Sequence, residues 1–157
     1  MAPTKGQSAA AWCTATLGHT FATPALLTEA LTHAGSAQKP TYERLEFLGD
    51  RVLGLAIAHL LHTTFPEANE GELGRRHAAL VQGTTLTEIA TEWNLGPHLR
   101  TGSSHVPAGV LADGVESLLG AIYLDAGWPV VTAVVQRFWA SRLTTLEGRD
   151  AKTTLQE

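Results

Sequence analysis

The sequence predicts an all-α fold, and three observations support that prediction. Apolar residues recur at helical spacing along most of the 157 residues. No segment of useful length alternates between polar and apolar residues as a half-buried strand would. Hydrophobic residues make up 44% of the chain and charged residues only 17%. These fractions predict one compact domain with a substantial core and little disorder.

Glycine, proline and capping residues divide the chain into its predicted elements. Gly18 ends the first helix, and Thr23-Pro24 has the pattern of an N-cap followed by proline at the first helical position. Gly96-Pro97 and Gly127 interrupt the later helices. The loop at 99–107 is rich in glycine, serine and histidine. The predicted helices span, in order, residues 7–17, 23–33, 40–64, 70–81, 84–94, 109–126 and 129–146.

The third predicted helix carries three carboxylates on one side. At about 100° per residue, Glu43, Glu46 and Asp50 fall within about 60° of one another. The rest of the helix is mostly apolar, which predicts that it lies in the core. Buried like-charged carboxylates cost several kcal/mol unless cations compensate them. Because Arg44 and Arg51 are the only basic neighbours, a bound metal ion is the simplest source of the missing charge.

A second acidic pair lies about sixty residues later on another apolar helical pattern. Asp113 and Glu116 are three residues apart, which places both side chains on one face of a helix. Two crossing helices with clustered oxygens would form a hard-cation site for magnesium or manganese. Cys13 is the only cysteine, and no histidine pair stands beside the acids, so a softer metal is not indicated. The alternative is that these acids cap helices or pair with Arg44, Arg51, Arg75 and Arg76.

These residues resemble a known family. Residues 43–50, Glu-Arg-Leu-Glu-Phe-Leu-Gly-Asp, followed by Val52-Leu53, are similar to the signature of the bacterial ribonuclease III catalytic domain. The segments 30–33, 70–81 and 112–125 resemble the family's flanking segments in the expected order. Departures from the family pattern are Gly35 for serine, Tyr42 for asparagine, and Gly114 and Ser117 for alanines. None of them removes a metal ligand.

The resemblance implies roles for particular residues and a homodimeric, all-helical domain. The family's metal-binding acids fall on Glu46, Asp50, Asp113 and Glu116, of which Asp50 and Glu116 are the expected catalytic residues. Further acidic positions that handle substrate fall on Glu43 and Glu70. Phe47 matches the aromatic residue that packs into the partner subunit.

The activity implied by the resemblance is magnesium-dependent hydrolysis of double-stranded RNA, with manganese able to substitute. The expected products carry 5′-phosphate and 3′-hydroxyl ends with short 3′ overhangs, as in ribosomal and messenger RNA processing. A non-catalytic RNA-binding relative of the same fold is one alternative, but it would be expected to lose metal-binding acids. A carboxylate-bridged redox bundle is another, and it would need Glu-x-x-His pairs that the two acidic helices lack.

The formal net charge of −4 is unusual for a protein that binds nucleic acid through phosphates. Bound divalent ions would reverse the sign of the acidic site. Residues 1–148 are expected to form the catalytic domain, and residues 149–157 resemble the start of a linker toward a double-stranded RNA-binding domain that this sequence lacks. No membrane span or secretion signal is predicted. With one cysteine, the expected location is the cytoplasm.

The remaining distinctive residues receive structural interpretations. The histidines are scattered without a nucleophile at a recognisable spacing, and His33 is expected to bond backbone or bridge helices. Asp125 is expected to be a cap or surface acid, and Cys13 a packing residue. Core or interface positions are expected for the four tryptophans, Trp12, Trp93, Trp128 and Trp139.

Overall fold

The computed structural model describes the backbone of residues 7–156 and the side chains of residues 7–143. The regular secondary structure of this part of the chain is all helical apart from one isolated backbone bridge between Thr32 and Arg100, which confirms the predicted fold class. The elements are α1 (Ala9–Leu17), α2 (Pro24–Ala30), α3 (Glu43–Thr64), α4 (Glu70–Val81), α5 (Gly83–Glu92), the 3₁₀ turn η1 (Gly96–His98), α6 (Ala108–Ala126) and α7 (Trp128–Gln156).

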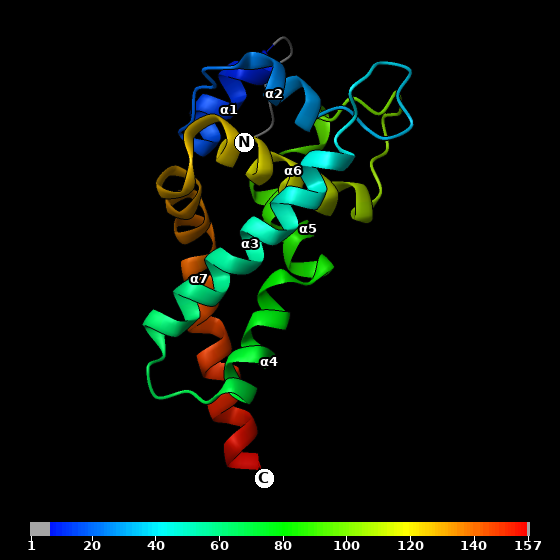
Figure 1. Ribbon diagram of the computed structural model, residues 1–157. Helices are drawn as coiled ribbons and strands as arrows, with labels where there is room; N and C mark the ends of the chain where they lie inside the picture. Colours follow the sequence, from blue (N-terminus) through cyan, green and yellow to red (C-terminus); the bar gives the residue numbers. More distant parts are fainter. Residues whose placement is uncertain (1–6, 157) are drawn as a thin grey trace.

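Helix α6 is the centre of the fold. From Ala112 to Ile122 every residue except Asp113 is buried, and α2, α3, α5 and α7 all pack against this helix. Figure 1 shows α3 running diagonally across the molecule, with α1 and α2 near its beginning and α4 near its end. A helix that is apolar on nearly all sides must be enclosed by other helices, which explains why the chain wraps around α6.

The second helix ends earlier than the sequence predicts. We expected it to reach about His33, but α2 ends at Ala30. The following backbone groups bond to distant segments: Arg100 N–H donates to the Leu31 carbonyl at 2.7 Å, and Tyr42 N–H donates to the Thr32 carbonyl at 2.8 Å. These bonds bring the loops before α3 and before α6 together beside the N-terminal end of α3.

The last helix continues beyond its predicted end near residue 146. In α7 the backbone is helical through Gln156, since no proline follows Pro129 and a single glycine, Gly148, is tolerated inside a helix at about 1 kcal/mol. The side chains of the predicted linker, together with residues 1–6 and 157, lie outside the described residues. The proposed boundary after residue 148 stays a prediction.

The tryptophans and the single cysteine form part of the core, as expected. Trp12, Trp93 and Trp139 are buried, and the indole N–H of Trp12 donates to the Trp93 carbonyl at 2.8 Å. Trp128 is only half-buried. Cys13 is fully buried. The Trp12 bond satisfies a buried indole N–H and ties α1 to the end of α5.

Asp125 was expected to be a cap or surface acid, but its side chain is buried and bonds residues that precede the first residue of α2. Its side chain is 2% exposed and lies 2.8 Å from His19 Nε2. It also accepts hydrogen bonds from the N–H groups of Ala22 and Thr23, each at 2.9 Å. Burial raises the pKa of the Asp125 carboxyl, but these hydrogen bonds outweigh burial and lower the pKa overall. The carboxylate therefore anchors the segment before α2 to the end of α6.

Among the described residues, no helix has both the length and the apolar character required to cross a membrane.

Candidate metal centre

The centre of the site is a close crossing of α3 and α6. A Cβ atom placed on Gly49 would lie 1.6 Å from the Glu116 carbonyl oxygen, and one on Gly120 would lie 2.3 Å from the Leu45 carbonyl oxygen. Neither position can hold a larger residue unless the backbones move apart. The two helices therefore touch backbone to backbone, and side chains one turn away from the contact can meet across it.

Three of the predicted ligands come together at this crossing. Glu46 of α3 and Asp113 and Glu116 of α6 each offer one oxygen, and these oxygens all lie within 4.8 Å of one another. Residues on two helices, separated by about seventy positions in the chain, thus form one group of carboxylates. Three hard oxygen donors at this spacing can hold a divalent cation.

The fourth predicted ligand, Asp50, lies at the solvent edge of this group. Its carboxyl shares a hydrogen bond with Glu116. Its side chain is 57% exposed and lies 3.3 Å from Nη1 of Arg51, which is 61% exposed. An ion pair this exposed contributes little stabilisation. The structure therefore places Asp50 beside the three-carboxylate group rather than inside it.

Burial and the neighbouring carboxylates make Glu46 and Glu116 difficult to ionise. The Glu116 pKa is raised to about 9, first by burial and then by the hydrogen bond to Asp50 and the charges of Asp50, Glu46 and Asp113. For Glu46 the pKa is raised to about 7, first by burial and then by Asp113, Glu43 and Asp50. No arginine is among the groups that shift the pKa of Glu46 or Glu116, so ion pairing does not offset the effect of burial on these two acids. The group thus fits a site that a cation completes.

One residue of the site was not singled out as functional from the sequence. Tyr42, immediately before α3, is buried, and its hydroxyl donates to Asp113 Oδ2 at 3.2 Å. Burial first, and then the neighbouring carboxylates Asp113, Glu46 and Glu43, raise the Tyr42 pKa well above its usual range. The phenol therefore stays protonated and can donate. The sequence signals were its position next to the acidic helix and its departure from the asparagine of the family pattern.

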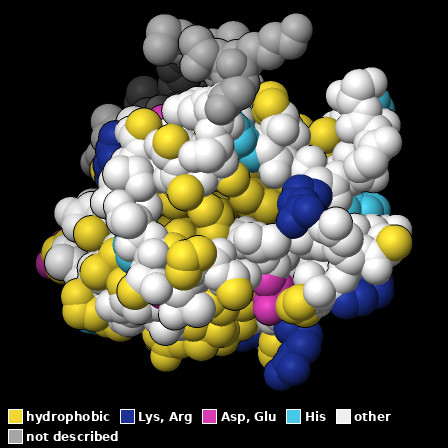
Figure 2. All heavy atoms as spheres, turned by 90° about the horizontal axis from the view of Figure 1, so that it is seen from above, with side chains coloured by type: hydrophobic (Ala, Val, Ile, Leu, Met, Phe, Trp, Pro, Cys, Tyr) yellow, Lys and Arg dark blue, Asp and Glu magenta, His cyan; other side chains and the backbone are white. Residues whose placement is uncertain are grey.

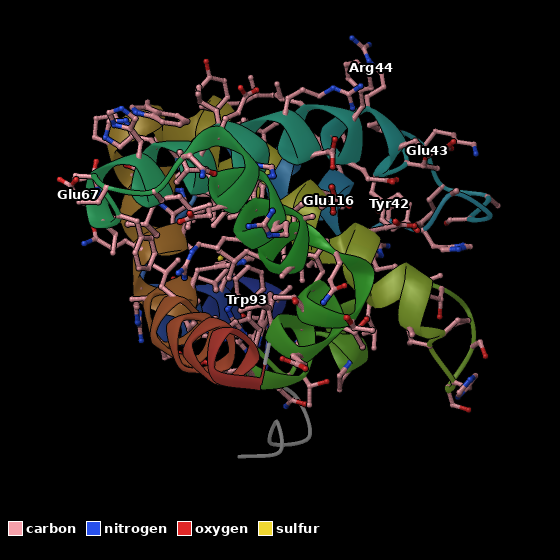
Figure 3. All side chains as sticks on the ribbon, turned by 90° about the horizontal axis from the view of Figure 1, so that it is seen from below. Tyr42, Glu43, Arg44, Glu67, Trp93 and Glu116 are labelled. Carbon is pink, nitrogen blue, oxygen red and sulfur yellow. The ribbon has the colours of Figure 1, made fainter. Side chains whose placement is uncertain are left out.

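The two acids expected to handle substrate lie far apart within one chain. Glu43, the first residue of α3, is exposed and accepts a hydrogen bond from the Thr41 hydroxyl at 3.1 Å. Glu70, the first residue of α4, is exposed beyond the other end of α3. From Glu46 to that end, α3 rises about 27 Å. Figure 3 shows Tyr42, Glu43 and Glu116 at one side and Glu67, three residues before Glu70, at the other.

Phe47 projects from the surface near the N-terminal end of α3, the end that carries Glu43 and Glu46. Its side chain is 63% exposed, and the Arg51 guanidinium lies 3.9 Å from its ring centroid. Beside it lies an open cavity of about 680 Å³. The cavity is lined by Glu29, Pro40, Thr41, Glu43, Arg44, Leu45, Phe47, Leu48 and Leu124. A large exposed aromatic beside a mostly apolar hollow is typical of an interaction surface.

Comparison with known proteins identifies the family. A family model described as Ribonuclease-III-like matches residues 23–143, which include all four predicted metal ligands. The chain belongs to the ribonuclease III family.

Curated relatives support this assignment over most of the chain. A Ribonuclease 3 of Azorhizobium caulinodans is 44% identical over 91% of this chain, and one of Hahella chejuensis is 48% identical over 90%. The chain spans 66% of the length of each of these relatives.

Solved structures agree with the fold. The nuclease domain of ribonuclease III from Campylobacter jejuni matches with a TM-score of 0.76 and 32% identity, covering 81% of this chain and 93% of that one. That structure is described as flexible in a region involved in dimer formation. A Dicer from Pichia stipitis matches with a TM-score of 0.67 and 26% identity, covering 82% of this chain and 59% of that one.

Proposed function

We propose that this chain is the catalytic domain of a magnesium-dependent endoribonuclease that cuts double-stranded RNA. The products would carry 5′-phosphate and 3′-hydroxyl ends with short 3′ overhangs. One observation supports this most strongly: Glu46, Asp113 and Glu116 gather their oxygens within 4.8 Å in a chain of the ribonuclease III family. Processing of ribosomal and messenger RNA in a bacterial cytoplasm is the setting we propose.

The residues fit magnesium, which this family is expected to use. All donors are carboxylate oxygens, the ligands that magnesium and manganese prefer, so manganese should substitute. Glu46, Asp113 and Glu116 would hold the ion, with Asp50 at the rim. When bound, a divalent ion lowers the pKa of water and neutralises charge at the phosphate.

The protein's own groups set up the rest of the reaction. Burial raises the pKa of the Glu116 carboxyl to about 9, so this carboxyl must lose its proton before it can bind a cation. Asp50 shares a hydrogen bond with Glu116 and faces solvent, so it can pass that proton to water. We therefore assign catalytic roles to Asp50 and Glu116. Glu43 and Glu70 are proposed to contact the substrate backbone.

Cutting both strands of a duplex requires two sites, and we propose that a homodimer supplies them. Phe47 is the most exposed large hydrophobic side chain among the described residues. The cavity beside it is largely apolar and has Leu48 and Leu124 in its lining. A two-fold dimer brings the same patch of both subunits together. Phe47 of each subunit would then fill the cavity of the other.

Recognition of RNA by this chain should rely on shape more than on charge. In Figure 2 the basic side chains on the visible face lie apart from one another instead of forming a continuous basic surface. Contacts to phosphates and 2′-hydroxyls across the minor groove can distinguish RNA from DNA without a dense basic patch. The relatives are longer than this chain. We propose that the additional residues in such proteins contribute further affinity for RNA.

The alternative is a non-catalytic RNA-binding member of the family. Retention of Glu46, Asp50, Asp113 and Glu116 argues against it. The raised pKa values of Glu46 and Glu116 impose a stability cost at neutral pH that a purely structural protein has no reason to keep.

The decisive experiment is incubation with a long RNA duplex in magnesium, in manganese and in a chelator. Products are sized, and their ends are tested for 5′-phosphate and 3′-hydroxyl groups. A DNA duplex of the same sequence is the control substrate. Metal-dependent cleavage of the RNA alone supports the proposal. Binding of RNA without cleavage in either metal would favour the non-catalytic alternative.

A further inference from the structure

Tyr42 is held rigidly at the junction where the loop before α3 meets the acidic group. Its N–H donates to the Thr32 carbonyl at 2.8 Å, and its carbonyl accepts from Glu46 N–H at 2.8 Å. The ring packs edge-on against His33 with 5.7 Å between centroids. The side chain is buried. Backbone and ring are both fixed, so the position of the hydroxyl is determined before any ligand arrives.

That hydroxyl contacts one specific atom of the candidate metal centre, Oδ2 of Asp113, at 3.2 Å. Asp113 also contributes an oxygen to the three-carboxylate group. A carboxylate that accepts a hydrogen bond loses freedom to rotate about its last side-chain torsion. The bond therefore orients Asp113 within the group, just as outer-shell hydrogen bonds orient metal ligands in general.

The chemical type of the donor matters as much as its position. A lysine or arginine at this place would bring a positive charge next to Asp113 and compete with a cation for the site. A phenol donates a hydrogen bond while carrying no charge. Tyr42 can therefore orient Asp113 and leave the negative charge of the group intact for the metal.

We propose that Tyr42 is a positioning residue of the metal centre, which acts through Asp113 and sets the affinity of the site for divalent ions. The inference rests on the proposed function in that it requires these carboxylates to bind a metal. It predicts an effect on metal affinity, with little effect on the maximal rate once metal is saturating, because the Tyr42 hydroxyl acts on the site through its bond to the Asp113 side chain.

The test compares Tyr42→Phe with the wild type in calorimetric titration with manganese and in cleavage across a series of metal concentrations. Loss of the hydroxyl should weaken manganese binding by about tenfold to a hundredfold. Cleavage should recover at high metal. Ser117→Ala is the matched control, because it removes a buried hydroxyl next to Glu116 that bonds only the carbonyls of Ala30 and Gly114. Its manganese affinity should stay at the wild-type level.

A second measurement needs no variant of Tyr42. The sequence has only two tyrosines, so protein labelled with carbon-13 at the tyrosine Cζ gives two resonances, assigned with Tyr123→Phe. Magnesium should shift the Tyr42 resonance and leave that of Tyr123 in place. The inference would be overturned if Tyr42→Phe bound manganese with unchanged affinity. It would also be overturned if the chemical shift of the Tyr42 resonance did not change when magnesium binds. Failure of the wild type to bind either metal would instead remove the proposed function.

Discussion

Gly49 of α3 and Gly120 of α6 lie against each other where the two helices cross. A Cβ on Gly49 would be 3.0 Å from the Gly120 nitrogen and 1.6 Å from the Glu116 carbonyl oxygen. The contact is between backbones, so no side-chain rotation can relieve an added methyl group. This separation sets the distance between Glu46 on one helix and the Asp113–Glu116 pair on the other.

Gly49→Ala should therefore force the helices apart. We expect a loss of about 3 kcal/mol or more in the free energy of unfolding, at the upper end of overpacking effects, together with weaker manganese binding. Gly74→Ala is the control, because a Cβ there meets nothing within 4 Å and should stabilise α4 by about 0.5–1 kcal/mol. Urea denaturation measures both. A stable Gly49→Ala variant with normal metal affinity would show that the crossing does not set the site.

Glu116→Gln and Asp113→Asn should abolish cleavage without unfolding the protein. Each change keeps the side-chain size and removes a charge that a metal requires. The loss of activity should exceed about a hundredfold, since even outer-shell changes reach that value. Metal-free stability should hold steady or rise, because Asp113→Asn removes a charge from the acidic group and Glu116→Gln removes the cost of keeping Glu116 protonated in the folded state. Glu88→Gln, an exposed acid whose carboxylate lies 3.7 Å from Arg142, is the control and should cleave normally.

The contribution of Glu46 and Glu116 to the stability of the metal-free protein should fall as pH rises. The folded-state pKa values are about 9 for Glu116 and about 7 for Glu46, above the ordinary 4.5. The folded protein therefore holds protons that the unfolded chain has already lost. The stabilising contribution is complete below pH 4.5 and is lost as pH rises through 7 and then 9.

Thermal unfolding in a chelator, measured for the wild type and Glu116→Gln at matched pH, isolates the Glu116 contribution. The difference in Tm between the two proteins should move in favour of the variant as pH rises. Magnesium should reverse the trend for the wild type, since metal binding displaces the protons. A Tm difference that does not change with pH would contradict the burial of the Glu116 carboxyl.

Phe47→Ala should shift the chain toward monomer. If the ring fills the partner's cavity, each site loses about 3 kcal/mol or more, and the contact occurs twice in a two-fold dimer. Val130→Ala is the control, because Val130 is 36% exposed and does not line that cavity. Sedimentation measures the equilibrium. If Phe47→Ala and Val130→Ala dimerise equally, Phe47 does not lie in the dimer interface.

This chain should cleave duplex RNA at low ionic strength and lose most of that activity near physiological salt. With a net charge of −4, few phosphate contacts are available, and affinity without metal should be weak. A double-stranded RNA-binding domain appended after Glu157 should restore activity through apparent substrate affinity, with little change in maximal rate. Saturation kinetics at two salt concentrations distinguish these parameters. Tight binding without metal would mean that the chain has a basic surface of its own.

The helical fold and the candidate ligands were predictable because they depend on local patterns. Periodicity and breakers located α3, α4 and α6 to within a few residues, since apolar spacing and caps act over one or two turns. Glu43, Glu46 and Asp50 on one helix and Asp113 and Glu116 on another were identified as a candidate cation site because carboxylates on apolar helices need compensation. The set of four metal ligands, Glu46, Asp50, Asp113 and Glu116, followed from the family resemblance. Of these, the structure places Asp50 at the exposed edge of the group. The angular spacing of residues around a helix predicts which side chains share a face. It does not predict how deeply each of these side chains is buried.

The sequence by itself determined the fold class, the order of the helices and which acids are candidates to bind a metal. Only the tertiary structure decided that Asp113 and Glu116 meet Glu46, because that meeting depends on the Gly49–Gly120 contact between segments about seventy residues apart. It also decided that α2 ends before Thr32 and that Tyr42 reaches Asp113. The reason is physical: local propensity fixes which backbone bonds a segment can form with itself, whereas packing decides which distant groups replace water around its side chains.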